Sequence, residues 1–126
     1  MYVIRADGNA KIGAGHLRRC LTIAEALAEK LDGNEEILFV CADEPSGEMV
    51  RKFGFPVKVL GTDFGNMESE LPKWQQMFGQ EEPTEKKKPV ILVDSYQVTD
   101  SYLEYFNSLC PVFYMDDECK RVYPVS

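Results

Sequence analysis

The only histidine of this 126-residue chain, His16, is the first residue whose type and position suggest chemistry. It follows a glycine-containing loop and stands at the start of a predicted helix over Gly15 to Leu31. The free N–H groups and the dipole of a helix start favour an anionic ligand. The same dipole favours a neutral imidazole, which can accept a proton. We therefore expect His16 to be a general base; the alternative is a histidine that only caps local backbone groups.

Two glycines, Gly13 and Gly15, lie in the loop before this helix. They permit unusual φ angles and a close approach of the backbone to a ligand. The segment does not match a dinucleotide-binding fingerprint, because Arg18 occupies the third glycine position and the glycines come too far after the strand. We expect no nicotinamide cofactor.

Arg19 lies three residues after His16, on the same side of the predicted helix. Its guanidinium could contact a substrate oxygen. A salt bridge to Asp7 or to Asp94 accounts for it equally well, and the sequence leaves these alternatives open.

Further polar residues follow predicted strands: Asp7, then Asp94 and Tyr96, then Asp116 and Asp117. Ligands of open α/β sheets bind at the carboxyl ends of the strands, so we expect these side chains at one rim. Each also has a structural alternative. Asp94 could bond loop N–H groups, Tyr96 could pack on the sheet edge, and the two later aspartates could cap a loop.

The elements that must position these residues alternate between strand and helix patterns. Continuous apolar runs such as Ile37–Ala42 suit strands covered on both faces. The predicted strands span 2–6, 37–42, 57–60, 90–93 and 112–115; the predicted helices span 15–31, 45–53, 70–78 and a segment capped by Thr99. Residues 81–89 are expected to be a mobile polar loop, and residues 119–126 the start of another strand. The pattern predicts one Rossmann-like α/β domain with a doubly wound, mostly parallel sheet and right-handed crossovers.

Composition excludes several classes of function. A formal net charge of −7 argues against nucleic-acid binding, and no apolar run approaches the roughly 20 residues that span a membrane. The amino terminus lacks the long apolar region of a signal peptide, which predicts the cytoplasm. Four cysteines without a Cys-x-x-Cys pair, together with one histidine, match no usual metal spacing. We expect neither a metal nor another cofactor.

The segment from Ile4 to Leu27 resembles the opening of the UDP-sugar hydrolases of pseudaminic acid biosynthesis and of related spore-coat polysaccharide biosynthesis proteins. The shared pattern is Arg-Ala-Asp followed by Gly-x-Gly-His-x-x-Arg-Cys, which ends here in His16, Arg19 and Cys20. A second piece, Val93-Asp94-Ser95-Tyr96, is similar to the family's Asp-x-Tyr, with serine where the family often has histidine. A third piece is the turn Met115-Asp116-Asp117.

This resemblance implies the amino-terminal half of a glycosyltransferase-B-type fold, with the active site between two halves. The family hydrolyses UDP-2,4-diacetamido-2,4,6-trideoxy-β-L-altrose to UDP and free sugar, without a metal and with inversion at C1. By resemblance, His16 and Tyr96 are the catalytic residues, which activate or position the attacking water. The resemblance also implies that the UDP-linked amino sugar is held by Asp7, Gly13, Gly15, Arg19, Asp94 and Asp117.

In the family the nucleotide is gripped mainly by a carboxyl-terminal half. We therefore expect the chain to be part of a longer protein, and the isolated domain to fold without turning over a UDP-sugar. Three alternatives remain. One is a glycosyltransferase of the same fold, another is a non-catalytic partner subunit, and the last is a receiver-like binding domain. The last would need its acidic pair after the first strand rather than after the fifth.

Overall fold

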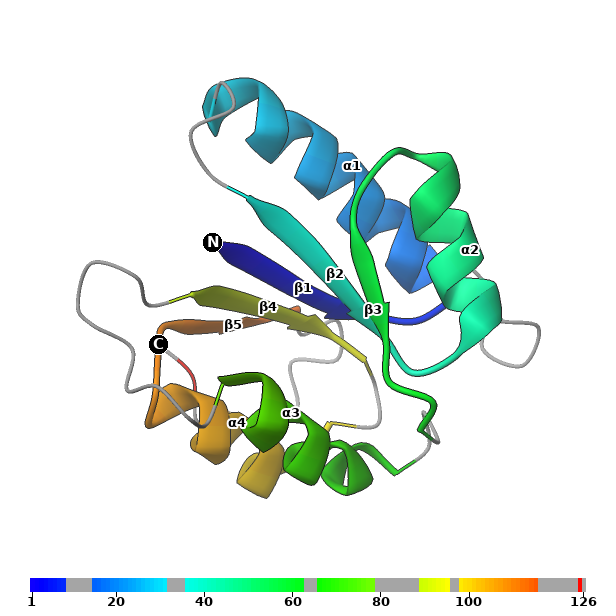
Figure 1. Cartoon of the computed structure of the whole chain (residues 1–126). Helices are drawn as coiled ribbons and strands as arrows, with labels where there is room; N and C mark the ends of the chain where they lie inside the picture. The colour runs from blue at the N-terminus through cyan, green and yellow to red at the C-terminus, as the bar shows by residue number, and fades with distance from the viewer. Residues whose placement is uncertain are drawn as a thin grey trace.

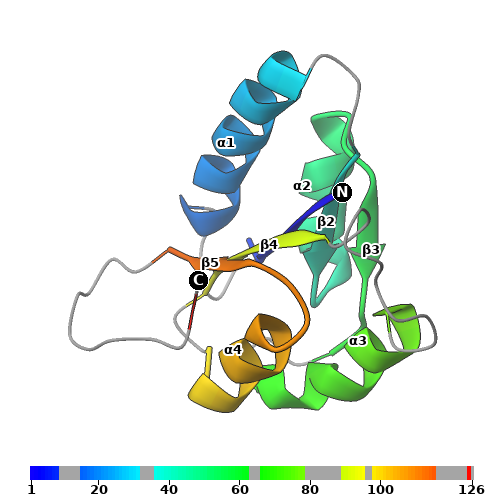
Figure 2. The ribbon, with the colours of Figure 1, turned by 90° about the vertical axis from the view of Figure 1, so that its left-hand side faces the viewer.

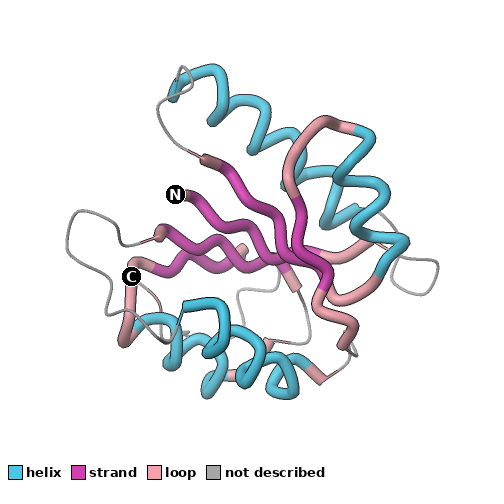
Figure 3. Tube along the Cα trace, in the orientation of Figure 1, coloured by secondary structure: helices cyan, strands magenta, loops and turns pink. Residues whose placement is uncertain are grey.

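The computed structural model describes residues 1–8, 15–31, 36–62, 66–78, 89–95, 98–115 and 125 of the chain. Within these ranges, strands and helices alternate from the amino terminus onward (Figure 1, Figure 3). The alternation agrees with the order of elements that the sequence predicts.

The described strands form one sheet in the order β3-β2-β1-β4-β5. They are β1 (Tyr2–Ala6), β2 (Ile37–Cys41), β3 (Val57–Val59), β4 (Val90–Asp94) and β5 (Val112–Tyr114). All four described pairings are parallel. The first strand lies in the middle, so that Tyr2 pairs with Ile37 on one side and with Val90 on the other. The predicted α/β, Rossmann-like fold is confirmed.

Helices cover both faces of this sheet (Figure 2). The helices α1 (Gly15–Leu31) and α2 (Glu44–Lys52) lie on one face. The 3₁₀ helix η1 (Met67–Glu70), α3 (Leu71–Phe78) and α4 (Asp100–Asn107) lie on the other. Successive side chains of β1 point to opposite faces of the sheet and so contribute to both helical layers. Val3 packs on the α3 and α4 side, whereas Ile4 and Ala6 pack on the α1 and α2 side.

Side-chain caps set the starts of two helices. The Thr99 hydroxyl accepts a hydrogen bond from the Tyr102 N–H over 3.2 Å, and α4 begins at the next residue as predicted. Asp43 caps α2 in the same way, since its carboxylate accepts from the Ser46 N–H over 3.0 Å. This cap starts α2 at Glu44, one residue earlier than the prediction.

Most other element ends differ from the prediction by one residue. The strands expected over 37–42, 57–60 and 112–115 each end one residue earlier, and β4 ends one residue later. The helix expected from residue 70 instead begins at Leu71, after the 3₁₀ turn of η1. Pro72 is then its second residue, where a missing N–H costs no helical bond. The predictions for 81–88, 119–124 and 126 lie outside the described residues.

The connectivity marks one place on the sheet for a ligand. The chain moves outward from β1 through β2 to β3, then crosses to β4 and β5 on the other side (Figure 1). The segments that leave β1 and β4 therefore diverge from the same edge of the sheet. Such a switch point at the carboxyl ends of parallel strands is where open α/β sheets bind ligands.

Candidate functional site

The switch point brings together three residues that the sequence predicted for the site. Asp94 is the last residue of β4, and His16 and Arg19 lie in the first turns of α1. Asp94 faces α1 because alternate residues of β4 point to opposite faces, and Ile91 and Val93 pack on the α3 and α4 side. The carboxylate thus lies beneath the start of α1.

Asp94 is 1% exposed, and every partner of its carboxylate among the described residues is an α1 side chain. Its Oδ1 lies 2.5 Å from His16 Nδ1. Arg19 donates from Nε to Oδ2 over 2.5 Å and from a terminal nitrogen to Oδ1 over 2.6 Å. The Cys20 thiol donates to Oδ2 over 3.4 Å. Within the described residues, Asp94 therefore joins α1 to β4 across the switch point.

His16 combines partial exposure with a fixed ring. Its side chain is 15% accessible to solvent, and its Nδ1 is held by the buried Asp94. A carboxylate that accepts the Nδ1 proton orients an imidazole and stabilises the positive charge that the ring gains as a base. The pair Asp94–His16 can thus accept a proton from a water or hydroxyl group at the rim.

Arg19 takes the salt bridge to Asp94, one of the alternatives that the sequence left open. Its side chain is 32% exposed, whereas the neighbouring Arg18 is exposed on the outside of α1. Two of its N–H groups are already committed to one carboxylate, so its positive charge is largely balanced within the protein. A contact between Arg19 and a substrate remains a prediction.

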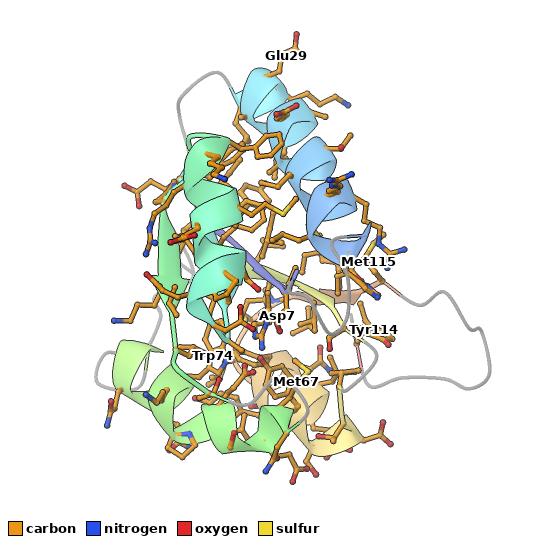
Figure 4. All side chains as sticks on the ribbon, turned by 90° about the vertical axis from the view of Figure 1, so that its right-hand side faces the viewer. Asp7, Glu29, Met67, Trp74, Tyr114 and Met115 are labelled. Carbon is orange, nitrogen blue, oxygen red and sulfur yellow. The ribbon has the colours of Figure 1, made fainter. Side chains whose placement is uncertain are left out.

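Asp7 lies at the same edge but belongs to a second polar cluster. Its Oδ1 accepts the Ala42 N–H over 2.8 Å, and its Oδ2 accepts from Arg5 over 2.7 Å. Figure 4 shows Asp7 on the sheet between the two helical layers. With 2% of its surface exposed, Asp7 ties the end of β1 to the end of β2, and its role in substrate binding stays a prediction.

The second cluster continues on the α3 and α4 side of the sheet, with residues that the sequence did not single out. Arg5 is fully buried and bonds Glu70, which is also fully buried. Glu70 in turn accepts from the Tyr102 hydroxyl over 3.0 Å and from the Trp74 indole over 3.3 Å. The one available signal was an arginine within the otherwise apolar strand Tyr2–Ala6; its partner could not be found, because Glu70 is distant in sequence.

Burial and charge act against each other in this cluster. Burial disfavours the charged Arg5 guanidinium, but the hydrogen bond and attraction to Glu70 outweigh it and hold the pKa of Arg5 well above its usual range. Burial, followed by the negative charge of Glu70, raises the pKa of the Tyr102 phenol. The cluster is therefore a charged acid–base pair with a neutral phenol donor.

Ser46 is another residue that sequence reasoning did not find. Its hydroxyl accepts the Gly8 N–H over 2.9 Å and donates to Asp43 over 2.7 Å. The side chain is fully buried at the start of α2. This bond anchors the backbone where it leaves β1 toward the glycine-containing loop.

Gly15, the first residue of α1, is exposed, and a Cβ placed on it would meet no atom within 4 Å. Its φ angle is not positive, since the described positive-φ glycines are Gly54 and Gly61. Gly15 therefore does not use the unusual φ angles that a glycine permits, because the helix has already begun there. The predicted site residues Gly13, Tyr96 and Asp117, together with Asp116, lie outside the described residues.

A cavity of about 360 Å³ lies at the opposite edge of the sheet, beside the starts of β1 and β2. Its lining includes Met1, Ala28 and Phe55 and is largely apolar. The polar residues that could do chemistry lie instead at the carboxyl edge, where we place the candidate site.

Three cysteines, Cys20, Cys41 and Cys110, are buried free thiols. Burial is the main cause that raises the pKa of Cys41 to about 12, and it raises the pKa of Cys20 further, with a contribution from Asp94. Thiols of this kind are unreactive at neutral pH. No group of three potential metal ligands occurs among the residues that the structure describes.

Comparison of the chain with family models, curated proteins and solved structures finds no match. In the described part of the chain, none of the helices has the length and apolar character needed to cross a membrane.

Proposed function

We propose that this chain is the catalytic amino-terminal half of a UDP-sugar hydrolase with a glycosyltransferase-B-type fold. The observation that carries the proposal is the Asp94–His16 pair at the switch point, with Nδ1 and Oδ1 2.5 Å apart. The pair joins the first two of the three sequence motifs on which the family resemblance rests, because His16 belongs to the first and Asp94 to the second.

The proposed reaction is an inverting displacement at C1 of a UDP-linked 2,4-diacetamido-2,4,6-trideoxyhexose. A water oxygen forms a bond to C1 while the bond from C1 to the β-phosphate oxygen breaks. The electron pair of that bond leaves with UDP, and the water proton passes to Nε2 of His16. Asp94 stabilises the imidazolium that results, as the aspartate does in a catalytic triad.

The remaining roles follow from the resemblance. Tyr96 positions the water or the sugar, and the start of α1 after Gly13 and Gly15 faces the diphosphate. By the same resemblance, Asp117 contacts the substrate. In this proposal the uridine is bound by a second domain, the protein acts in the cytoplasm, and its product enters nonulosonic acid or surface polysaccharide biosynthesis.

The test uses the full natural product of the gene, incubated with the UDP-sugar in water enriched in ¹⁸O. The proposal expects ¹⁸O in the free sugar and none in the released UDP, together with inversion of the anomeric centre in early NMR spectra. Label in UDP would mean attack at phosphorus and would refute the mechanism. Transfer of the sugar to an added acceptor would favour the glycosyltransferase alternative.

The matched variants are His16→Asn and Arg18→Gln. Loss of a positioned general base should lower kcat by about 10²- to 10⁴-fold in His16→Asn. Arg18→Gln alters an exposed residue of the same helical turn and should keep full activity. Equal activity of His16→Asn and the natural protein would overturn the assignment of His16.

A further inference from the structure

We propose that Arg19 is a positioning residue: it holds the Asp94 carboxylate so that His16 carries its proton on Nδ1. This role of Arg19 rests on the proposed function at one point only, which is that His16 is the general base. It also gives Arg19 a role other than binding a substrate oxygen.

One face of α1 converges on one carboxylate, that of Asp94. His16, Arg19 and Cys20 are spaced at three and four residues, so they share a side of α1. All three side chains contact Asp94. A buried carboxylate with this many donors has a single orientation, set by the donor that binds it most strongly.

Arg19 is that donor. It contacts both carboxylate oxygens, at 2.5 Å and 2.6 Å, with two separate nitrogens. Such two-point contacts between a guanidinium and a carboxylate are charge-assisted and fix the plane of the carboxylate. The plane places Oδ1 against the imidazole of His16, and the thiol of Cys20 adds a weaker contact to Oδ2.

The contacts of Asp94 decide where the imidazole proton lies. Oδ1 and Nδ1 are 2.5 Å apart, so a hydrogen bond joins them and one of the two atoms donates its proton. A carboxylate that accepts from two guanidinium N–H groups has no proton of its own to offer. The proton therefore belongs to Nδ1, and in the neutral ring Nε2 carries the lone pair.

The nearby Arg19 nitrogen supports the same tautomer. It lies 3.5 Å from Nδ1, at the limit for a hydrogen bond, and 2.6 Å from Oδ1. If Nδ1 were unprotonated, its lone pair would face the Oδ1 lone pairs at 2.5 Å, which is repulsive. The guanidinium thus binds the carboxylate and leaves Nδ1 to donate.

His16 is the only histidine, so its imidazole nitrogens give the only such signals in a ¹⁵N NMR spectrum of the chain. Long-range ¹H–¹⁵N correlation, recorded on the neutral ring, reports which nitrogen is protonated. We expect Nδ1–H. A spectrum of the Nε2–H form would overturn the proposal, and because no substrate is present, it would do so independently of the activity assay.

Asp94→Asn tests the carboxylate. The asparagine amide has only one oxygen, and we expect it to accept the hydrogen bonds of the charged Arg19. The NH₂ group would then face His16. Nδ1 then accepts a hydrogen bond, and the spectrum should change to the Nε2–H form. Retention of the Nδ1–H form in Asp94→Asn would contradict the proposed source of the tautomer.

Arg19→Gln tests the two-point contact between Arg19 and Asp94. The control is Arg18→Gln, on the exposed side of the same turn. We expect Arg19→Gln to move the imidazole signals toward Nε2–H and Arg18→Gln to leave them unchanged. Identical imidazole spectra for the two variants would overturn the role of Arg19. If Arg19→Gln fails to fold, Arg19→Lys decides: a lysine lacks the two-point contact and should move the signals part of the way, and unchanged signals would again overturn the role.

Discussion

Arg5 and Glu70, 65 positions apart in the sequence, form an ion pair in which neither side chain is exposed to solvent. The guanidinium Nε donates to Oε1 over 2.8 Å, and a terminal nitrogen donates to Oε2. The pair joins the central strand to η1 through the interior. Because both charges are fully buried, the stability of the domain depends on their pairing.

Replacing Glu70 by alanine should destabilise the domain by about 3–5 kcal/mol, because it leaves the buried Arg5 charge without its main partner. Urea denaturation followed by circular dichroism measures the loss. The control is Glu48→Ala, which removes an exposed carboxylate from α2 and should change stability by less than about 0.5 kcal/mol. Similar losses of unfolding free energy in the two variants would contradict the stabilisation that we attribute to the buried Arg5–Glu70 pair.

Ser46→Ala should expose the Gly8 amide to exchange with solvent. The variant removes the hydroxyl that accepts this N–H, so a buried donor loses its partner at a cost of about 1–3 kcal/mol. Hydrogen exchange at Gly8, read by NMR, should accelerate correspondingly. Ser101→Ala, an exposed change in α4, should leave the Gly8 rate as it is. An unchanged rate in Ser46→Ala would mean that the hydroxyl does not protect the Gly8 amide.

Two glycine-to-alanine changes should have different effects on the stability of the fold. A Cβ on Gly47 would lie 2.6 Å from a methyl group of Val59, so Gly47→Ala should cost about 1–3 kcal/mol through overpacking. A Cβ on Gly15 has open space, so Gly15→Ala should fold at least as stably as the natural chain. Thermal unfolding compares the two. If the proposed function holds, Gly15→Ala lowers turnover while preserving the fold, because the methyl group then meets the substrate.

Stability should fall steeply at alkaline pH. Burial raises the pKa values of Cys20, Cys41 and Tyr102, so the folded protein retains protons that the unfolded chain releases. The stabilisation is complete below the unfolded pKa values, about 8.5 for a thiol and 10 for a phenol, and is lost as pH rises above them. Each group contributes a slope of about 1.4 kcal/mol per pH unit.

Urea denaturation at several pH values between 8 and 11 measures this slope. Near pH 9.5 the folded protein should hold about two protons more than the unfolded chain, and the difference should rise toward three at higher pH. Cys41→Ala should reduce the slope by about 1.4 kcal/mol per pH unit, since one retained proton is removed. A slope that does not change in Cys41→Ala would show that this thiol titrates equally in the folded and unfolded states.

The sequence predicted the fold well because its strongest signals are local. Apolar runs defined the strands, and the spacing of Leu17, Cys20, Leu21 and Ala24 identified the buried side of α1. The predicted cap by Thr99 depends on residues within one turn, whereas the cap by Asp43 was not predicted. The 3₁₀ turn before Leu71 was missed, because its formation depends on the packing of Met67 and Glu70 in the core.

The site was predictable only in part. Motif spacing pointed to His16, Arg19 and Asp94, but could not determine which aspartate pairs with Arg19, because that depends on how β4 lies beside α1. The contacts of Ser46 and Glu70 were not predictable at all. Each joins segments that are distant in sequence, and serine and glutamate at those positions resemble ordinary helix-start residues.

The central position of β1 determines when the domain can fold during synthesis. Its neighbour β4 begins at Val90, and the aromatic partners of Glu70 include Tyr102, so much of the chain must leave the ribosome before β1 is enclosed. Until then the Arg5 charge requires hydration, which opposes early burial of the first three strands. A nascent chain that ends before residue 70 therefore displays an unenclosed apolar strand with a charge in its middle. Burial of the central strand therefore has to wait for Glu70, the residue that neutralises this charge.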